Sequence, residues 1–153
     1  MVSAGILLYR HRGDTVEVLL AHPGGPFWAN RDEGAWSLPK GEAGDGEDYL
    51  AVARREFREE IGIPVACDAA WPLGSVTLRS GKTVFGWACE GDIDPARQHS
   101  NSFSMEWPPR SGRTQEFPEV DRVEWFSPET ARRKLNPAQA TFVDRLLGIL
   151  NES

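Results

Sequence analysis

The charged segment at residues 55–60, REFREE, contains three glutamates close enough together in sequence to form a reactive or metal-binding cluster. Its three glutamates, Glu56, Glu59 and Glu60, would share one arc of a helix surface, because a helix turns once in about 3.6 residues. Neighbouring carboxylates repel one another unless a cation lies among them. Their oxygen atoms suit Mg²⁺ or Mn²⁺, and Mg²⁺ is usually bound by few carboxylates together with substrate phosphates. The pattern therefore points to a phosphate ester or anhydride as substrate.

The same segment also fits an ordinary salt-bridged helix surface. Arg54, Arg55 and Arg58 could neutralise the glutamates, and Arg55 precedes Glu59 by one helical turn. Such exposed pairs contribute only about a few tenths of a kcal/mol. For the segment taken alone this second interpretation is favoured, since charge runs are usually solvated. The residues that precede the segment decide between the two.

A glycine and a glutamate stand upstream of the segment at fixed distances from it. Residues 41–63, GEAGDGEDYLAVARREFREEIGI, match the pattern G-x5-E-x7-R-E-U-x-E-E-x-G-U at every specified position, where U is a bulky apolar residue. This pattern is the Nudix box, and the chain resembles the Nudix hydrolases through it. The order of expected elements also resembles the Nudix fold over nearly the whole chain. The resemblance implies an α/β/α sandwich with a mixed central sheet, and hydrolysis of a nucleoside diphosphate linked to another moiety with a divalent metal.

The resemblance also implies roles for individual residues. It assigns metal ligation or water activation to the three glutamates, often joined by the backbone carbonyl of Lys40. Arg55 would orient the acids through Glu47, since a ligating carboxylate needs a partner that fixes its rotamer. Which carboxylate acts as the general base differs among Nudix enzymes, so that assignment stays open.

The segment that precedes the Nudix box indicates which kind of Nudix hydrolase the chain resembles. Residues 36–41, WSLPKG, resemble the corresponding segment of diadenosine-polyphosphate hydrolases and related nucleoside-polyphosphate pyrophosphohydrolases. The Lys40 side chain could contact a phosphate or be an exposed lysine at a strand end. Those relatives carry a further glutamate before a strand that ends in Trp and an apolar residue. Glu119, upstream of Trp125, fits that place as an extra ligand or base, with Glu116 as the alternative. Either could instead be a solvated loop acid.

Residues in expected loops are candidates for holding the rest of the substrate. Aromatic rings can stack on a nucleobase, and the candidates are Trp28, Phe103 and Trp107, although core packing is the commoner fate of an aromatic ring. Arg110 and Arg113 could bind phosphates through charge-assisted hydrogen bonds or be exposed.

The leading functional prediction is Mg²⁺- or Mn²⁺-dependent hydrolysis of a pyrophosphate linkage in a nucleoside polyphosphate. The substrate would be a nucleoside triphosphate or a dinucleoside polyphosphate such as diadenosine tetraphosphate (Ap4A). The alternatives are a hydrolase of ADP-ribose, nucleotide sugars, damaged nucleotides or RNA 5′ ends, and a nucleotide sensor without turnover. The complete acidic set argues against a sensor, because adjacent carboxylates carry a cost in repulsion.

Several elements must position these residues. A helix over residues 47–61 would bury Leu50, Ala53, Phe57 and Ile61 and end at Gly62. Residues 3–9 with 16–21, and 71–79 with 82–89, have the patterns of paired strands, and residues 122–126 those of a further strand. Residues 22–41 are expected to be loop, with a short strand at 36–38, and 92–114 are expected to be a long loop. Two helix starts follow, at Ser127 and Asn136, the second directing Phe142, Leu146 and Leu147 inward.

Composition bounds the rest. Residues 1–153 are expected to form a single domain, since 40% of them are hydrophobic and 26% charged. A net charge of −6 makes nucleic acid an unfavourable partner and a small nucleotide a better one. The apolar run at the N-terminus is too short for a signal peptide or a membrane span. Cys67 and Cys89 lack metal-site spacing and are expected to be buried free thiols in a cytoplasmic protein.

Overall fold

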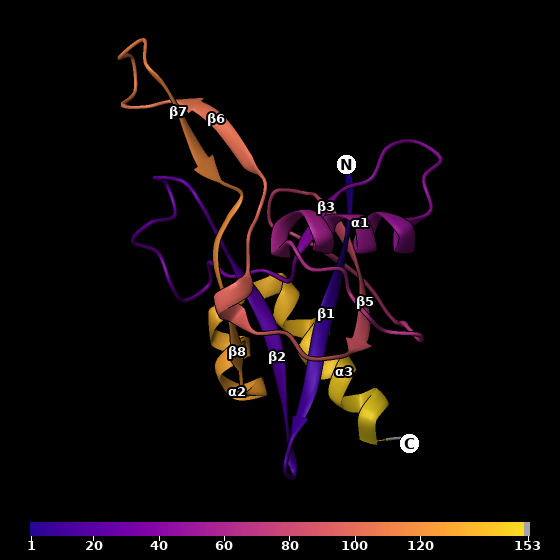
Figure 1. The fold of residues 1–153 in the computed structure, drawn as a ribbon. Coiled ribbons are helices and arrows are strands. Elements are labelled where there is room, and N and C mark those ends of the chain that lie inside the picture. The colour runs from indigo at the N-terminus through magenta and orange to yellow at the C-terminus, as the bar shows by residue number, and fades with distance from the viewer. Residues whose placement is uncertain (152–153) are drawn as a thin grey trace.

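The computed structural model describes residues 1–151, which are organised around a six-stranded mixed sheet (Figure 1). The path of the sheet is β4-β5-β1-β2-β8, and β3 pairs with β1 beside this path. The strands of this sheet are β1 (Val2–Arg12), β2 (Thr15–Pro23), β3 (Lys40–Glu42), β4 (Trp71–Thr77), β5 (Thr83–Glu90) and β8 (Val120–Phe126). The helices are α1 (Tyr49–Ile61), α2 (Pro128–Lys134) and α3 (Ala140–Asn151), with short 3₁₀ helices η1 (Pro95–Arg97) and η2 (Pro137–Gln139).

Strand β1 lies at the centre of the sheet and makes it mixed. It runs antiparallel to β2 and parallel to β5, with Gly5 opposite Gly86. The residues from Ser3 to Tyr9 of β1 are all buried, as is typical of a strand covered on both faces. The predicted mixed sheet is confirmed, as are the pairings of β1 with β2 and of β4 with β5.

Helices cover both faces of the sheet, as predicted (Figure 1). On one face, Phe57 and Ile61 of α1 pack against Ile6, Leu8 and Leu19. On the other face α2 and α3 contribute to a second cluster, which contains Leu7, Leu20, Trp36, Ala131, Phe142 and Leu146. None of the helices in the described part of the chain is long and apolar enough to cross a membrane.

Helix α1 differs slightly from its expected form. It begins at Tyr49 rather than Glu47, because the Asp48 side chain accepts a hydrogen bond from the Ala51 N–H and so caps the helix. Val52 is buried together with Ala53, whereas the expected core residue Leu50 is only half-buried. The buried face of α1 thus consists of Val52, Ala53, Phe57 and Ile61. In α3, Leu147 is likewise half-buried.

The expectation of a long structureless loop over residues 92–114 is wrong. Strand β6 (Ser102–Glu106) pairs antiparallel with β7 (Thr114–Pro118). Together they form a two-stranded arm that projects from the end of the main sheet nearest α1 (Figure 1). Phe103 lies opposite Phe117, and both are half-buried. The residues on either side of each phenylalanine are exposed, so the alternation was too weak a signal to identify a strand among prolines and glycines.

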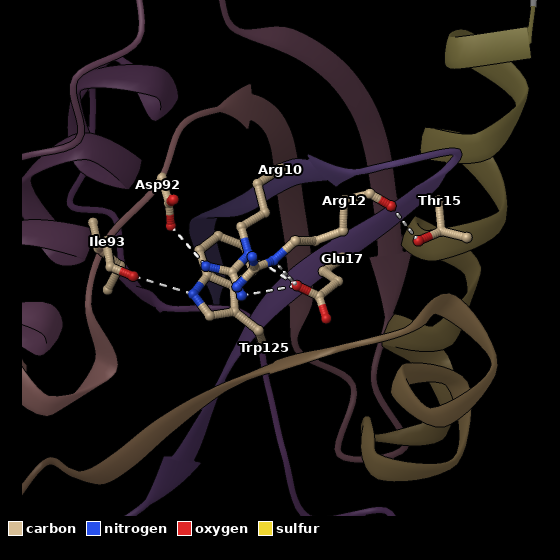
Figure 2. A network of polar contacts seen from close by, with 7 residues as sticks. All are labelled: Arg10, Arg12, Thr15, Glu17, Asp92, Ile93 and Trp125. Atoms are coloured by element: carbon tan, nitrogen blue, oxygen red, sulfur yellow. Dashed lines mark hydrogen bonds and ion pairs between the residues drawn. The ribbon is translucent and has the colours of Figure 1, made fainter.

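A polar network fixes the chain between β5 and the arm (Figure 2). The guanidinium of Arg10 lies 4.1 Å from the centroid of the Trp125 ring, and its Nη1 donates to Asp92 Oδ1 at 2.8 Å. Its Nε donates to Glu17 at 2.9 Å, and Trp125 Nε1 donates to the Ile93 carbonyl at 3.1 Å. These contacts hold the chain that leaves β5 against β1, β2 and β8.

The two cysteines are not free thiols, so that expectation is wrong. Cys67 and Cys89 are paired in a disulfide, with their Cα atoms 5.8 Å apart. The segment after α1 returns over β5, where the Cys89 side chain is buried. Sequence spacing alone does not show that return. The expectation of a cytoplasmic protein, so far as it rested on free thiols, has no support from these residues.

Candidate active site

The acidic residues are positioned by the two ends of α1 and by its buried face. Gly62 ends the helix in the left-handed conformation, with φ of 79°, and its N–H donates to the Arg58 carbonyl. Phe57 and Ile61 are fully buried, so the helix cannot rotate about its axis without exposing them. The side chains of Glu56 and Glu60 are thereby directed toward the chain at β3.

Strand β3 lies directly against these two acids. The backbone N–H of Lys40 donates to Glu60 Oε1 at 3.3 Å. A Cβ atom on Gly41 would stand 1.7 Å from Glu56 Oε1, which no side chain could tolerate without displacing the carboxyl group. The first glycine of the box thus leaves the room that the Glu56 side chain occupies against its backbone.

The surroundings disfavour ionisation of both acids. Burial raises the pKa of Glu60 to about 8, with smaller contributions from the charges of Glu56 and Glu119, although Lys40 opposes the rise. Burial, together with the neighbouring Glu59 carboxyl, raises the pKa of Glu56 to about 7. Burial also lowers the pKa of Lys40, whose ammonium group faces Lys82 as well as these acids. Lys40 is half-buried beside the acids rather than an exposed strand-end lysine.

Arg55 and Glu47 form the contact expected from the resemblance. Arg55 Nη1 donates to Glu47 Oε2 at 2.7 Å, and Glu47 Oε1 accepts from the Gly44 N–H at 2.6 Å. These two hydrogen bonds lower the pKa of Glu47, the one from Arg55 contributing most. The pair ties the loop before α1 to the middle of the helix, next to Glu56 and Glu59.

Glu119 comes close to the α1 acids from a different part of the chain. Its charge contributes to the raised pKa of both Glu56 and Glu60. Its N–H donates to the Asn101 carbonyl at 2.8 Å, and its own carbonyl accepts from the Gly24 N–H at 3.0 Å. Glu116, the alternative, is exposed on β7 opposite Ser104. Of the two candidates, Glu119 is thus the one whose charge acts on Glu56 and Glu60.

The oxygen atoms available at this site are of the type that binds a hard divalent cation. They are carboxylate oxygens from α1 and from the residue before β8, beside a backbone segment at Lys40, and the negative charge they concentrate favours a cation. Among residues 1–151, no three His, Cys, Asp or Glu side chains surround a common point. Glutamate side chains have several rotatable bonds, and convergence on one ion would require changes of rotamer.

The predicted substrate contacts are divided between the root and the tip of the arm. Phe103 lies near the root, where a Cβ on Gly25 would stand 2.9 Å from its ring. Trp107 lies beyond β6, in edge contact with Phe27 at 5.7 Å between ring centroids. Trp28 is partly exposed and lies near the Arg31 guanidinium.

Arg110 and Arg113 lie at the exposed tip of the arm. The strands of the arm run from the pair Ser102–Pro118 at the root to Glu106–Thr114 at the tip. At about 3.3 Å per residue, the tip stands roughly 13 Å from the root. The structure therefore does not bring these two arginines to the acids.

Sequence reasoning missed two groups of residues around the site. The first is the segment at residues 98–101, whose contacts with both α1 and Glu119 no local pattern indicates. The second is His22, which is fully buried: its Nδ1 lies 2.8 Å from Asp121 Oδ1 and its Nε2 lies 2.6 Å from the Arg31 carbonyl oxygen. His22 thus anchors the loop that carries Phe27 and Trp28.

A shallow hollow of about 300 Å³ lies beside the acids on the outer surface of α1. Its lining comprises Arg54, Arg55, Arg58, Glu59, Pro64 and Val65. Positive charge thus flanks the carboxylates on the solvent side, where an anionic substrate would approach.

Comparison with known proteins identifies the family of the domain. The profile of the NUDIX domain matches residues 1–146. An RNA pyrophosphohydrolase of Caulobacter vibrioides is 39% identical over 59 residues, which cover 35% of this chain and 34% of that relative. The alignment thus spans about a third of the curated relative's length.

Solved structures share the fold over nearly the whole chain. A C. elegans Ap4A hydrolase binary complex superposes with a TM-score of 0.64 and 20% identity, covering 99% of each chain. The NUDIX domain of Shewanella oneidensis NrtR complexed with ADP ribose gives a TM-score of 0.64 and 14% identity, over 98% of this chain and 88% of that one. Because the NUDIX domain profile matches almost the entire chain, the chain belongs to the Nudix family.

Proposed function

We propose that the protein is a pyrophosphohydrolase that cleaves a phosphoanhydride linkage in a nucleoside polyphosphate with the help of Mg²⁺ or Mn²⁺. Its substrate would be a nucleoside triphosphate or a dinucleoside polyphosphate such as Ap4A. The observation that carries the proposal is the packing of Glu56 and Glu60 against β3 with Glu119 nearby. Such a cluster is unfavourable without a cation, and membership of the Nudix family supplies the reason for its presence.

Within this proposal, Glu56, Glu59, Glu60 and Glu119 would hold the metal, together with the Lys40 carbonyl. A bound divalent ion would neutralise charge on the phosphate chain and lower the pKa of a bound water. Arg55, held by Glu47, would restrict the helix surface on which Glu56 and Glu59 lie. One of the carboxylates would accept the proton of the attacking water, and Glu119 is a candidate because it comes from outside the helix.

The Lys40 ammonium would assist by its position among the acids. It lies near Glu56 and Glu60, where its charge can meet a phosphate oxygen that approaches the metal ligands. Phe103, Trp28 and Trp107 remain candidates for contact with the base. Phe103 packs on Gly25, in the loop that begins with the Gly24 N–H bonded to Glu119, and Trp107 contacts Phe27 of the same loop. The arm-tip residues Arg110 and Arg113 would reach only a long or flexible substrate.

Other nucleoside diphosphate derivatives are the second candidate substrates. The Shewanella NrtR domain, which shares this fold, is complexed with ADP ribose, so ADP-ribose and nucleotide sugars belong in the test. RNA 5′ ends also belong there because of the C. vibrioides relative, although a net charge of −6 opposes the binding of a long polyanion. A sensor without turnover is disfavoured by the intact set of acids.

The decisive experiment is a product-release assay over a panel of substrates with Mg²⁺, then with Mn²⁺. The panel comprises nucleoside triphosphates, Ap4A, ADP-ribose, a nucleotide sugar and a 5′-triphosphorylated RNA. We expect a nucleoside polyphosphate to be the best substrate and Glu60→Gln to abolish its hydrolysis without loss of the fold. The proposed metal-dependent site would be contradicted if Glu60→Gln turned over substrate as fast as the wild-type protein. It would also be contradicted if a chelator left the turnover of the wild-type protein unchanged. Nucleotide binding without any turnover would instead identify a sensor.

A further inference from the structure

One amide side chain connects the two parts of the chain that supply the acidic residues. Gln98 Nε2 donates to the Glu60 carbonyl at 2.9 Å and to the Val120 carbonyl at 3.2 Å. Glu60 lies in the last turn of α1, and Val120 is the first residue of β8, directly after Glu119. The amide therefore bridges the backbone of the catalytic helix and the backbone next to Glu119.

The backbone around Gln98 makes the same connection. Residues 98–101, here called the strap, run from η1 to the start of the arm. The His99 N–H donates to the Ile61 carbonyl and the Asn101 N–H to the Glu59 carbonyl, both at 2.9 Å. The last carbonyls of a helix have no partner within the helix. The strap supplies those partners at the point in α1 where the acids lie.

The strap is bound equally closely to the Glu119 side. Asn101, which donates to Glu59, accepts from the Glu119 N–H at 2.8 Å. The hydroxyl of Ser100, a buried residue, accepts a hydrogen bond from the Val120 N–H at 3.2 Å and donates one to the Val120 carbonyl at 3.0 Å. On the helix side, a Cβ on Gly62 would stand 2.4 Å from the His99 carbonyl oxygen. The strap thus fits tightly between α1 and β8.

From these contacts we propose that Gln98 is a positioning residue, which fixes Glu119 relative to Glu56, Glu59 and Glu60 so that acids from two segments can serve one metal site. This inference rests on the proposed function, since it takes Glu119 to be a ligand or base. Gln98 touches neither metal nor substrate and acts through the backbone of Glu60 and Val120. It differs from the rest of the strap because one side chain reaches both segments at once.

The test replaces Gln98 by Met, which keeps the length of the side chain and removes the amide. The readout is Mn²⁺ binding to the substrate-free protein, measured by calorimetry or electron paramagnetic resonance. Loss of a residue that supports metal ligands typically weakens metal binding about 10- to 100-fold, and we expect a loss of about 10-fold. Thermal unfolding in the presence of chelator monitors the fold of the variant, and Gln98→Asn provides a second, milder variant if Gln98→Met does not fold.

Gln115→Met is the matched control. Gln115 lies on the arm, where its Nε2 also donates to a backbone carbonyl, that of Trp107, at 3.0 Å. The same chemical change at this exposed position should leave Mn²⁺ affinity unchanged.

A double-mutant cycle with Glu119→Gln tests whether Gln98 acts through Glu119. Residues that act through one another have non-additive effects. Gln98→Met should therefore weaken Mn²⁺ binding clearly less in the Glu119→Gln background than in the wild-type protein. Independent, additive losses would overturn the proposed route.

The outcomes separate this inference from the proposed function. If the wild-type protein and Gln98→Met bind Mn²⁺ equally well, Gln98 is only structural and the inference fails while the proposed function stands. If Gln98→Met weakens Mn²⁺ binding but no substrate is hydrolysed, the positioning role holds and the proposed activity fails. If the wild-type protein binds no Mn²⁺, both fail.

Discussion

Replacing Glu60 by Gln should stabilise the metal-free protein at high pH while it abolishes hydrolysis. Glu60 keeps its proton longer in the folded protein than in the unfolded chain, because burial raises its pKa from 4.5 to about 8. Glutamine has nearly the same shape and can still accept the hydrogen bond from the Lys40 N–H. It carries no charge at any pH, so the variant removes the titration and preserves the contact.

The sign follows from which state holds the proton. Below about pH 4.5 the carboxyl is protonated in both states and makes no difference to stability. Between the unfolded and folded pKa values the unfolded chain has released its proton and the folded protein has not. The free energy of unfolding therefore falls as pH rises through this window, and the full loss is reached above about pH 8.

The shift sets an upper limit to the loss. At about 1.36 kcal/mol per pKa unit, a rise from 4.5 to about 8 corresponds to about 5 kcal/mol. Water that reaches the ionised carboxyl reduces this, so we expect about 2–3 kcal/mol. The assay is urea unfolding with chelator at pH 5 and pH 9, for the wild-type protein and for Glu60→Gln.

Wild-type stability should fall from pH 5 to pH 9 by about 2–3 kcal/mol more than that of the variant. Adding Mn²⁺ at pH 9 should stabilise the wild-type protein, since a ligand that binds only the folded state raises its stability, and should do so much less for the variant. Parallel pH profiles of the two proteins would refute the reasoning, because Glu60 would then not be held where its charge is costly.

Three further substitutions probe other parts of the site and core. Gly41→Ala should lower both Tm and turnover, because the new Cβ would lie 1.7 Å from the Glu56 carboxyl oxygen; normal turnover in a kinetic assay would contradict the packing of Glu56 on β3. Arg55→Lys should reduce kcat by about 10-fold with little change in Tm, because the ion pair with Glu47 is exposed; an unchanged kcat would count against a positioning role. Phe57→Ala should destabilise the protein by about 3–5 kcal/mol in urea unfolding, since the ring is fully buried; a loss below about 1 kcal/mol would show that the core collapses around the gap.

The helix that carries the acids could be predicted because its determinants are local. Phe57 and Ile61 recur at helical spacing and Gly62 follows as a cap, and the structure confirms a helix that buries this face. The strand pairs β1–β2 and β4–β5 were predictable for the same reason, since in each pair a short turn joins two short segments rich in apolar and β-branched residues.

The arm and the disulfide could not be predicted in this way. The strands of the arm are short and mostly exposed, so burial leaves only a weak alternation at Phe103 and Phe117. The pairing of Cys67 with Cys89 depends on the path of the chain after α1. The spacing of residues along the sequence indicates neither the arm nor the disulfide.

The family and the cluster on α1 can be identified from the sequence, because helix periodicity places Glu56, Glu59 and Glu60 together whatever surrounds them. The residues from other segments that lie near this cluster are visible only in the tertiary structure. It brought Glu119 to the acids through the strap at residues 98–101 and left Arg110 and Arg113 at the far end of the arm. It also showed that Gly41 leaves room for the Glu56 side chain and that burial disfavours ionisation of Glu60. The physical reason is that proximity between distant segments and exclusion of water both arise from packing, which no single stretch of sequence contains.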